Sequence, residues 1–241
     1  MKLSILVPVY NECGLIAECL SRVRAAPLPP GVEIEIIVVD DGSTDGTAKL
    51  LDALAPEGGF RLLRHHRNQG KGAAVRTALS AATGEVVLIQ DGDLEYDPAD
   101  YPALLQPFLD GKADAVFGSR FAPSDKPRVL LFWHTIANRR LTALSNVFTG
   151  LRLTDMWTCY KAARAGFLKD LPLRCNGFCL EPELTAKLAR QGCRIVEVPI
   201  RYRGRAYSQG KKIGLLDAAR SLGVMLFFWI VSDLGPKSPG R

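Results

Sequence analysis

Short apolar runs alternate with segments whose apolar residues recur at helical spacing. The runs of strand length are residues 3–9, 34–39, 61–65, 85–90 and 113–118, and the helical segments are residues 14–25, 44–54 and 70–82. We expect Ser43 or Thr44 to cap the second helix. This order predicts an α/β fold with a doubly wound, mostly parallel, Rossmann-like sheet and helices on both faces. Such sheets bind ligands at the carboxyl ends of their strands.

The pattern changes after Arg120, where residues 122–128 are polar and include two prolines. Further on, residues 129–149 and 181–191 have helical periodicity, and residues 194–203 are typical of a strand. We expect this part to extend the first, so that residues 1–212 form a single domain.

Residues 213–234 predict one long helix, followed by a disordered tail at 235–241. Its uncharged stretch, residues 221–232, is shorter than the roughly 20 apolar residues that a spanning helix needs. Because aromatic side chains at 227–229 suit the headgroup boundary, we expect an amphipathic helix at a membrane interface. Packing on the core or in a dimer interface is the alternative, so a homo-oligomer stays open.

Hydrophobic residues make up 47% of the 241 residues, which is typical of a globular chain with one sizeable core. The net charge of +6 fits a partner that carries phosphate. The basic residues are dispersed and lack interleaved aromatics, which argues against nucleic acid as that partner. The start has no signal-peptide run, and the six cysteines form no C-x-x-C pair, so we expect reduced thiols in a cytoplasmic protein.

Three carboxylates follow the apolar strand at 85–90: Asp91, Asp93 and Glu95. Carboxylates two apart at a strand end suit a hard cation, Mg²⁺ or Mn²⁺, which also keeps room for substrate phosphates. A solvated acidic turn is the alternative, but the position after a buried strand favours a metal site. Such a cation would offset the charge of a diphosphate leaving group.

Two further loops carry candidate chemistry. Asp40 ends the second strand, where it would bind a base or ribose, or else make a turn with an Asx hydrogen bond. The glycines of N-Q-G-K-G at 68–72 permit close approach of the backbone, and the following helix N-terminus attracts anions, with Lys71 adding a charge near a phosphate. The loop lacks the spacing of a Walker P-loop, and the absence of G-x-G-x-x-G argues against a dinucleotide dehydrogenase.

Eight motifs then follow in one order: VPVYNE (7–12), VVDDGSTDGT (38–47), NQGKGAA (68–74), QDGDLEYDP (90–98), FGSRF (117–121), LTDMWTCYK (153–161), EPELTAKLAR (181–190) and GKKIG (210–214). The ordered set resembles the family-two inverting glycosyltransferases of the GT-A fold. Within them it resembles the dolichol- and polyprenyl-phosphate sugar transferases. The resemblance covers nearly the whole chain, and the order is more specific than any single motif.

The resemblance implies transfer of a hexose from a GDP-mannose or UDP-glucose type donor to a polyprenyl or dolichyl phosphate with inversion. It divides the domain into a nucleotide-sugar half (1–120) and an acceptor half (121–212). The implied nucleotide-sugar ligands are Pro8, Tyr10, Glu12, Asp40, Lys71, Asp91, Asp155, Arg205 and Lys211. The implied metal ligands are Asp91, Asp93 and Glu95, with Arg120 and Arg128 for the acceptor phosphate. Catalysis would rest on Asp93, Asp91 and Arg120.

Two observations bear on the acceptor. A lipid phosphate has a second pKa of about 6, so it attacks as an anion, whereas a saccharide or lipid hydroxyl would need a positioned base. Trp157 stands where relatives carry an acidic residue, which puts the identity of the sugar in question. Trp157 also leaves open that the protein binds nucleotide sugars without catalysis. The alternative is that the tryptophan is a simple packing substitution. The expected location is peripheral, on the cytoplasmic face of a membrane.

Overall fold

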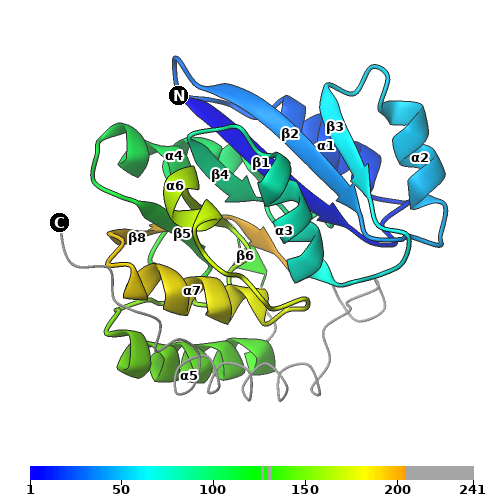
Figure 1. The fold of residues 1–241 in the computed structure, drawn as a ribbon. Coiled ribbons are helices and arrows are strands. Elements are labelled where there is room, and N and C mark those ends of the chain that lie inside the picture. The colour runs from blue at the N-terminus through cyan, green and yellow to red at the C-terminus, as the bar shows by residue number, and fades with distance from the viewer. Residues whose placement is uncertain (126–127, 130–131, 205–241) are drawn as a thin grey trace.

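A seven-stranded sheet forms the centre of the computed structural model, which describes residues 1–125, 128–129 and 132–204 (Figure 1). The strand order is β3-β2-β1-β4-β7-β5-β8, and β6 and β9 pair in a second, small sheet. The strands are β1 (Lys2–Val9), β2 (Glu33–Asp40), β3 (Phe60–Arg64), β4 (Val86–Ile89), β5 (Ala115–Ser119), β6 (Arg128–Val129), β7 (Lys161–Arg164), β8 (Ile195–Pro199) and β9 (Tyr202–Arg203).

The predicted mostly parallel, α/β sheet is confirmed. Strands β1, β2, β3 and β4 run parallel, as do β5 and β8. The exception is β7, which pairs antiparallel with both β4 and β5 and so leaves these two pointing the same way. The sequence gives little sign of β7, because its two alanines stand between Lys161 and Arg164. The predicted strand at 194–203 is divided into β8 and β9.

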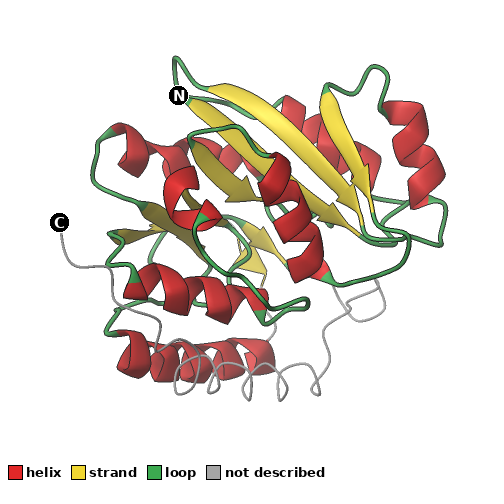
Figure 2. Cartoon of the chain, viewed as in Figure 1, coloured by secondary structure: helices red, strands yellow, loops and turns green. Residues whose placement is uncertain are grey.

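Helices cover both faces of the sheet (Figure 2). One apolar cluster joins α1 and α4 to one face, and a second joins α3, α6 and α7 to the other. The long helix α5 packs against α7, outside the layer next to the sheet (Figure 1). The helices are α1 (Ile16–Arg24), α2 (Thr47–Leu54), α3 (Lys71–Ala81), α4 (Tyr101–Leu109), α5 (Phe132–Thr149), α6 (Ala165–Lys169) and α7 (Leu180–Arg190), with a 3₁₀ turn, η1, at Pro98–Asp100.

Local chemistry explains where the helices differ from expectation. Helix α2 begins at Thr47, after Gly46 in the left-handed region (φ 99°), so the predicted cap by Ser43 or Thr44 is wrong. The Ser43 hydroxyl instead accepts a hydrogen bond from the Asn11 amide (3.0 Å). No helix was expected at α4, which carries Pro107 in its interior, where proline usually breaks a helix.

Several predicted features lie outside the described residues: Arg205, Lys211, the helix at 213–234 and the tail at 235–241. Arg128 is described only as part of β6. Within the described part of the chain, no helix is both long enough and apolar enough to cross a bilayer.

Candidate active site

The predicted site residues gather at one edge of the sheet. Register pairs Val9 with Asp40 across β1 and β2, and Leu6 with Ile89 across β1 and β4, so these parallel strands end at the same edge. Strand β5 points the same way and ends just before Arg120. The loops after β1, β2, β4 and β5 therefore lie together, as ligand loops do in open α/β sheets.

The loops after β1 and β2 interlock through side-chain caps. The amide of Glu12 donates to the Thr47 hydroxyl (3.0 Å). Asp40 is 2% exposed, and its carboxylate accepts the Ser43 amide (3.0 Å) and lies 3.7 Å from the Arg64 guanidinium. Asp40 thus makes the turn that its sequence predicted, and a role in binding base or ribose stays a prediction.

Asp41 holds the N-Q-G-K-G loop in place. Its carboxylate accepts the amides of Gln69 (3.0 Å) and Gly70 (2.8 Å), and it lies 2.6 Å from Nδ1 of His65. Nε2 of His65 in turn lies 2.8 Å from the Thr77 hydroxyl on α3. Because Asp41 is 2% exposed, it acts as a fixed anchor for the residues just before Lys71.

A buried cluster of charges lies beside the D-G-D segment. The Lys71 ammonium is 2.7 Å from Oδ1 of Asp91 and 2.9 Å from Oε1 of Glu181. Burial alone would lower the pKa of Lys71, but the two carboxylates raise it well above its ordinary value, so the ammonium stays charged. Burial also raises the pKa of the adjacent Cys159 thiol, whose Sγ is 3.7 Å from Glu181.

Glu181 is a site residue that sequence reasoning missed. Its motif, EPELTAKLAR, was part of the resemblance but carried no assigned role. The signal was an acidic residue in the first turn of a helix whose N-terminal half is buried. Only the tertiary fold brings that helix beside Lys71.

The other two carboxylates of the predicted metal centre, Asp93 and Glu95, make contacts of their own. Oε2 of Glu95 accepts the Tyr202 hydroxyl (2.5 Å), and Asp93 accepts the Glu95 amide (3.1 Å). Among the described residues no group of three or more acidic, His or Cys side chains gathers into a metal-ligand set. Leu94 between them has φ 62°, a strained value for leucine that is typical of functional loops.

The carboxylates nonetheless suit a divalent cation. Asp91 already holds a cation, the Lys71 ammonium, which marks this carboxylate as a position where positive charge is stabilised. Mg²⁺ and similar ions often take only one or two protein carboxylates and complete their shell with substrate phosphates and water. Asp91 and Asp93, two residues apart after β4, fit that mode of binding.

The N-terminus of α3 differs from the expectation that it binds an anion. The amides of Gly72 (2.7 Å) and Ala73 (3.3 Å) donate to the carbonyl oxygen of Asn176. Two of the first amides of the helix are therefore used by the protein itself and are not available to a phosphate. Arg76 reinforces the contact by donating to the side-chain oxygen of Asn176.

The loop that makes this contact is closed by a disulfide between Cys175 and Cys179, whose Cα atoms are 5.8 Å apart. That separation is within the ordinary range for a disulfide. The expectation that all six cysteines are reduced is wrong for this pair. A four-residue spacing without C-x-x-C did not reveal it, because the turn into α7 brings the two side chains together.

Arg120 and Asp155 form a bidentate pair. Nε of Arg120 is 2.7 Å from Oδ2 of Asp155, and Nη2 is 2.8 Å from Oδ1. Burial would raise the pKa of Asp155, but the guanidinium holds it below its ordinary value. The guanidinium also lies 4.9 Å from the centroid of the Tyr202 ring. Both residues occupy the site edge, and their roles toward the acceptor phosphate and donor sugar stay predictions.

Lys161 fixes the segment that carries Trp157. Its buried ammonium donates to the carbonyls of Met156 (2.6 Å) and Thr158 (2.7 Å), and burial lowers its pKa to about 8. Trp157 packs against the second apolar cluster, as in the packing alternative. Its indole Nε1 is buried and has no hydrogen-bond partner within the described chain.

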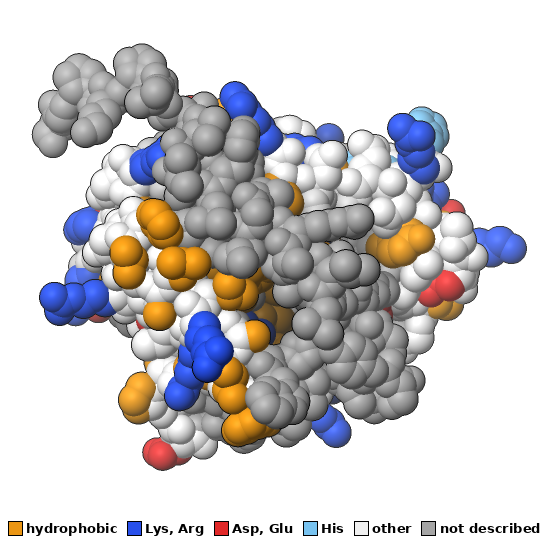
Figure 3. All heavy atoms as spheres, turned by 90° about the horizontal axis from the view of Figure 1, so that it is seen from below, with side chains coloured by type: hydrophobic (Ala, Val, Ile, Leu, Met, Phe, Trp, Pro, Cys, Tyr) orange, Lys and Arg blue, Asp and Glu red, His pale blue; other side chains and the backbone are white. Residues whose placement is uncertain are grey.

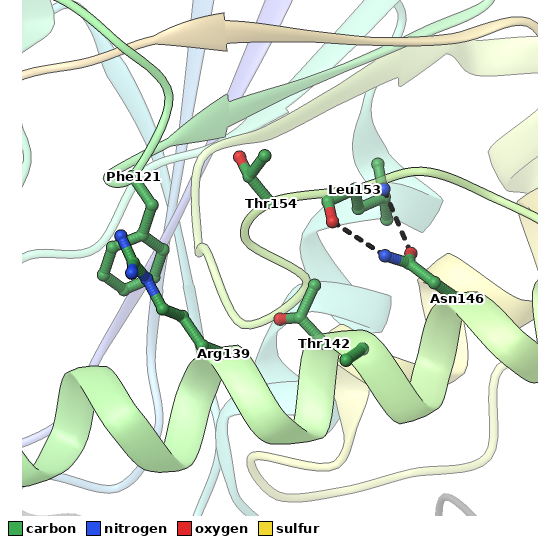
Figure 4. A pocket seen from close by; sticks show the side chains of 7 residues that line it. Phe121, Arg139, Thr142, Asn146, Leu153 and Thr154 are labelled. Carbon is green, nitrogen blue, oxygen red and sulfur yellow. Dashed lines mark hydrogen bonds between the residues drawn. The ribbon is translucent and has the colours of Figure 1, made fainter.

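A cavity of about 240 Å³ lies between α5 and the segment before Asp155 (Figure 4). At one end the Arg139 guanidinium lies 5.5 Å from the Phe121 ring centroid. At the other, Asn146 and Leu153 exchange two hydrogen bonds (2.8 and 3.0 Å). The lining residues are Phe121, Arg139, Thr142, Ala143, Asn146, Leu153 and Thr154.

Known proteins resemble this chain over most of its length. The family model for glycosyl transferase family 2 matches residues 4–171. An undecaprenyl-phosphate mannosyltransferase of Micrococcus luteus is 32% identical, with 89% of this chain and 88% of the relative covered. A dolichol-phosphate mannosyltransferase of Pyrococcus furiosus is 28% identical, with 88% of this chain and 61% of the relative covered.

A solved structure shares the fold. Glucosyl-3-phosphoglycerate synthase from Mycobacterium tuberculosis, in complex with phosphoglyceric acid, superposes with a TM-score of 0.72 at 25% identity. The match covers 97% of this chain and 82% of that one. The same synthase has been solved with Mn²⁺, UDP and phosphoglyceric acid (TM-score 0.71, 24% identity, 97% of this chain and 80% of that chain covered). These neighbours support the GT-A fold.

Proposed function

Since the chain belongs to glycosyl transferase family 2 and is a glycosyltransferase, we propose that it transfers a hexose from a nucleotide-diphosphate sugar to a polyprenyl phosphate. The observation that carries the proposal is the buried centre of Lys71 and Asp91 at the sheet edge, with the Arg120–Asp155 pair on the same edge. The names of the undecaprenyl- and dolichol-phosphate relatives support the acceptor.

The donor would lie across the ends of β1, β2 and β4. Nucleotide binding by Pro8, Tyr10, Glu12 and Asp40 rests on their common edge, and a diphosphate would meet Lys71. Asp91 and Asp93 would hold Mg²⁺ or Mn²⁺, which supplies charge neutralisation for the departing diphosphate. Charged groups that the fold already holds at this edge need little reorganisation during the reaction, which is how preorganised sites stabilise developing charge.

The chemistry is one displacement. An oxygen of the acceptor phosphate attacks the anomeric carbon from the face opposite the leaving group. The bond between that carbon and the diphosphate breaks, and the nucleotide diphosphate leaves with the electron pair. Because the acceptor is already an anion, no base is required. The product therefore has the inverted configuration.

An acceptor with a lipid tail suits the face on which α5 lies. Three large exposed apolar side chains, Phe132 (69%), Val147 (79%) and Phe148 (47%), belong to this helix. Apolar side chains gather on this face of the molecule (Figure 3). We place a peripheral contact with the cytoplasmic face of a membrane here as part of the proposal, with Arg139 at the nearby cavity as a cation for a headgroup.

A hydroxyl acceptor is the second candidate. It is favoured by the structural similarity to a synthase whose name gives phosphoglycerate as the glucosylated compound. The two acceptors are separated by one assay.

The test supplies the protein and Mn²⁺ or Mg²⁺ with UDP- and GDP-sugars. Each donor is combined with a short polyprenyl phosphate, the matching polyprenyl alcohol, 3-phosphoglycerate or no acceptor. We expect one donor to label only the lipid phosphate, with inversion at the anomeric carbon by NMR. Asp93→Ala should abolish labelling, and the exposed Asp52→Asn should not. Retained configuration, or labelling of an alcohol instead, contradicts the proposal.

A further inference from the structure

The Lys71 ammonium lies between two carboxylates that belong to different elements of the fold. The ammonium is 2.7 Å from Asp91, at the end of β4, and 2.9 Å from Glu181, in the first turn of α7. The side chains of Lys71, Asp91 and Glu181 are 11%, 17% and 5% exposed. In such surroundings water screens the charges poorly, so the positions of the three groups depend strongly on one another.

The Glu181 carboxylate can accept a further hydrogen bond. Its Oε1 lies near both Lys71 and Cys159, whereas its Oε2 is buried and has no hydrogen-bond partner among the residues that the structure describes. A buried carboxylate oxygen without a partner is unfavourable. A shift of the ammonium from Asp91 toward Glu181 would supply that partner.

Hydrogen bonds hold the backbone on either side of Lys71. Asp41 accepts the Gly70 amide before it, and Asn176 accepts the Gly72 amide after it. The long side chain of lysine rotates about several bonds. Movement of the ammonium between the two carboxylates therefore requires no movement of α3.

We propose that Lys71 is an internal cation that occupies Asp91 before the divalent metal arrives, and that Glu181 is the positioning residue that receives the ammonium when the metal takes Asp91. This inference rests on the proposed function, in which Asp91 binds the metal. Two cations close to one carboxylate repel each other, so the metal and the ammonium compete. Without Glu181 the displaced ammonium would have no second counter-charge.

The test measures the dissociation constant of Mn²⁺, without nucleotide, from the EPR signal of free Mn²⁺. Wild type is compared with Lys71→Met, Glu181→Gln and the double variant. Lys112→Met is the control, since Lys112 pairs with Asp110 before β5, at the opposite end of the strands from the site. Circular dichroism checks that each variant is folded. Glu181→Gln keeps the Lys71–Asp91 pair, so it tests the exchange even if Lys71→Met does not fold.

We expect Lys71→Met to bind Mn²⁺ about tenfold more tightly than wild type, and Glu181→Gln about tenfold more weakly. In the Lys71→Met background, Glu181→Gln should change the affinity by less than about twofold, because its effect acts through the ammonium. The control should match wild type.

Unchanged or weaker Mn²⁺ binding by Lys71→Met overturns the inference, as does an equal effect of Glu181→Gln in both backgrounds. If wild type binds Mn²⁺ in these outcomes, the proposed function stands. If Mn²⁺ binds to neither wild type nor Lys71→Met, even with UDP or GDP added, then the metal requirement of the proposed function fails together with the inference. Binding by Lys71→Met alone supports the inference.

Discussion

Replacing Asp155 with asparagine should destabilise the protein strongly. The Asp155 carboxylate is fully buried and accepts four hydrogen bonds. Three come from Arg120, from its amide (3.0 Å), Nε (2.7 Å) and Nη2 (2.8 Å), and one from Asn138 (3.1 Å). Asparagine has nearly the same shape, but its amide nitrogen would face a donor, and the guanidinium would lose its counter-charge.

The magnitude follows from burial. Removing one partner of a buried ion pair leaves an uncompensated charge and costs about 3–5 kcal/mol. With a urea m-value of about 2–3 kcal/mol/M, the unfolding midpoint should fall by roughly 1–2.5 M. The lowered pKa of Asp155 means that its contribution is complete above the ordinary carboxyl pKa and is lost as pH falls through the lower, folded-state pKa. The difference between the two proteins should therefore be constant near neutral pH and shrink only in acid.

The control is Asp114→Asn. Asp114 also forms a bidentate pair, with Arg194, but that arginine side chain is 57% exposed. The Asp114 side chain is 14% exposed, but solvent around the arginine screens the pair, so this variant should lose clearly less than Asp155→Asn. The double variant Asp155→Asn/Arg120→Met should recover part of the loss, because the unpaired charge is gone. A loss below about 1 kcal/mol for Asp155→Asn would refute the reasoning that burial makes this pair costly to break.

Three further outcomes are expected. Gly72→Ala should lower the melting temperature and the yield of folded protein, because the added Cβ would overlap the carbonyl oxygen of Cys175. A melting temperature equal to that of wild type would show that the loop can move to make room. Reduction of the disulfide, or the double variant Cys175→Ser/Cys179→Ser, should lower the free energy of unfolding by about 2 kcal/mol, as expected for a short closed loop. Thiol labelling that finds both cysteines free in the untreated protein would exclude the disulfide. For Lys161, with its pKa of about 8 in the folded state, the unfolded chain binds more protons between pH 8 and 10.5. The free energy of unfolding of wild type should thus rise relative to Lys161→Met by about 3 kcal/mol across that window in urea titrations, and a flat difference would contradict the pKa.

The elements that the sequence predicted well are those with a strong local signal. Strands β1, β2 and β4 are continuous apolar runs, and the amphipathic α1 has a regular helical period. The elements that were not predicted are stabilised by contacts with other parts of the chain. Strand β7 is held by ladders to β4 and β5, and its charged Lys161 is accommodated by two carbonyls of the preceding loop.

The site residues also differ in how far a local signal predicted them. The position of Asp91 after a buried strand was enough to mark it as a candidate, since the carboxyl ends of parallel strands share an edge. The roles of Asp41 and Glu181 could not be predicted, because an acidic residue at a strand end or helix start has the same local pattern whether it binds a ligand or holds a loop.

The sequence by itself determined the alternation of strands and helices, and with it the edge where the motifs meet, because hydrophobic period and strand ends are local properties. Only the tertiary structure decided which charges pair. Lys71 meets Asp91 and Glu181, and Asn176 takes the amides at the start of α3, through segments far apart in the chain. Those pairings depend on how α7 and its preceding loop pack on the sheet, which no local pattern specifies.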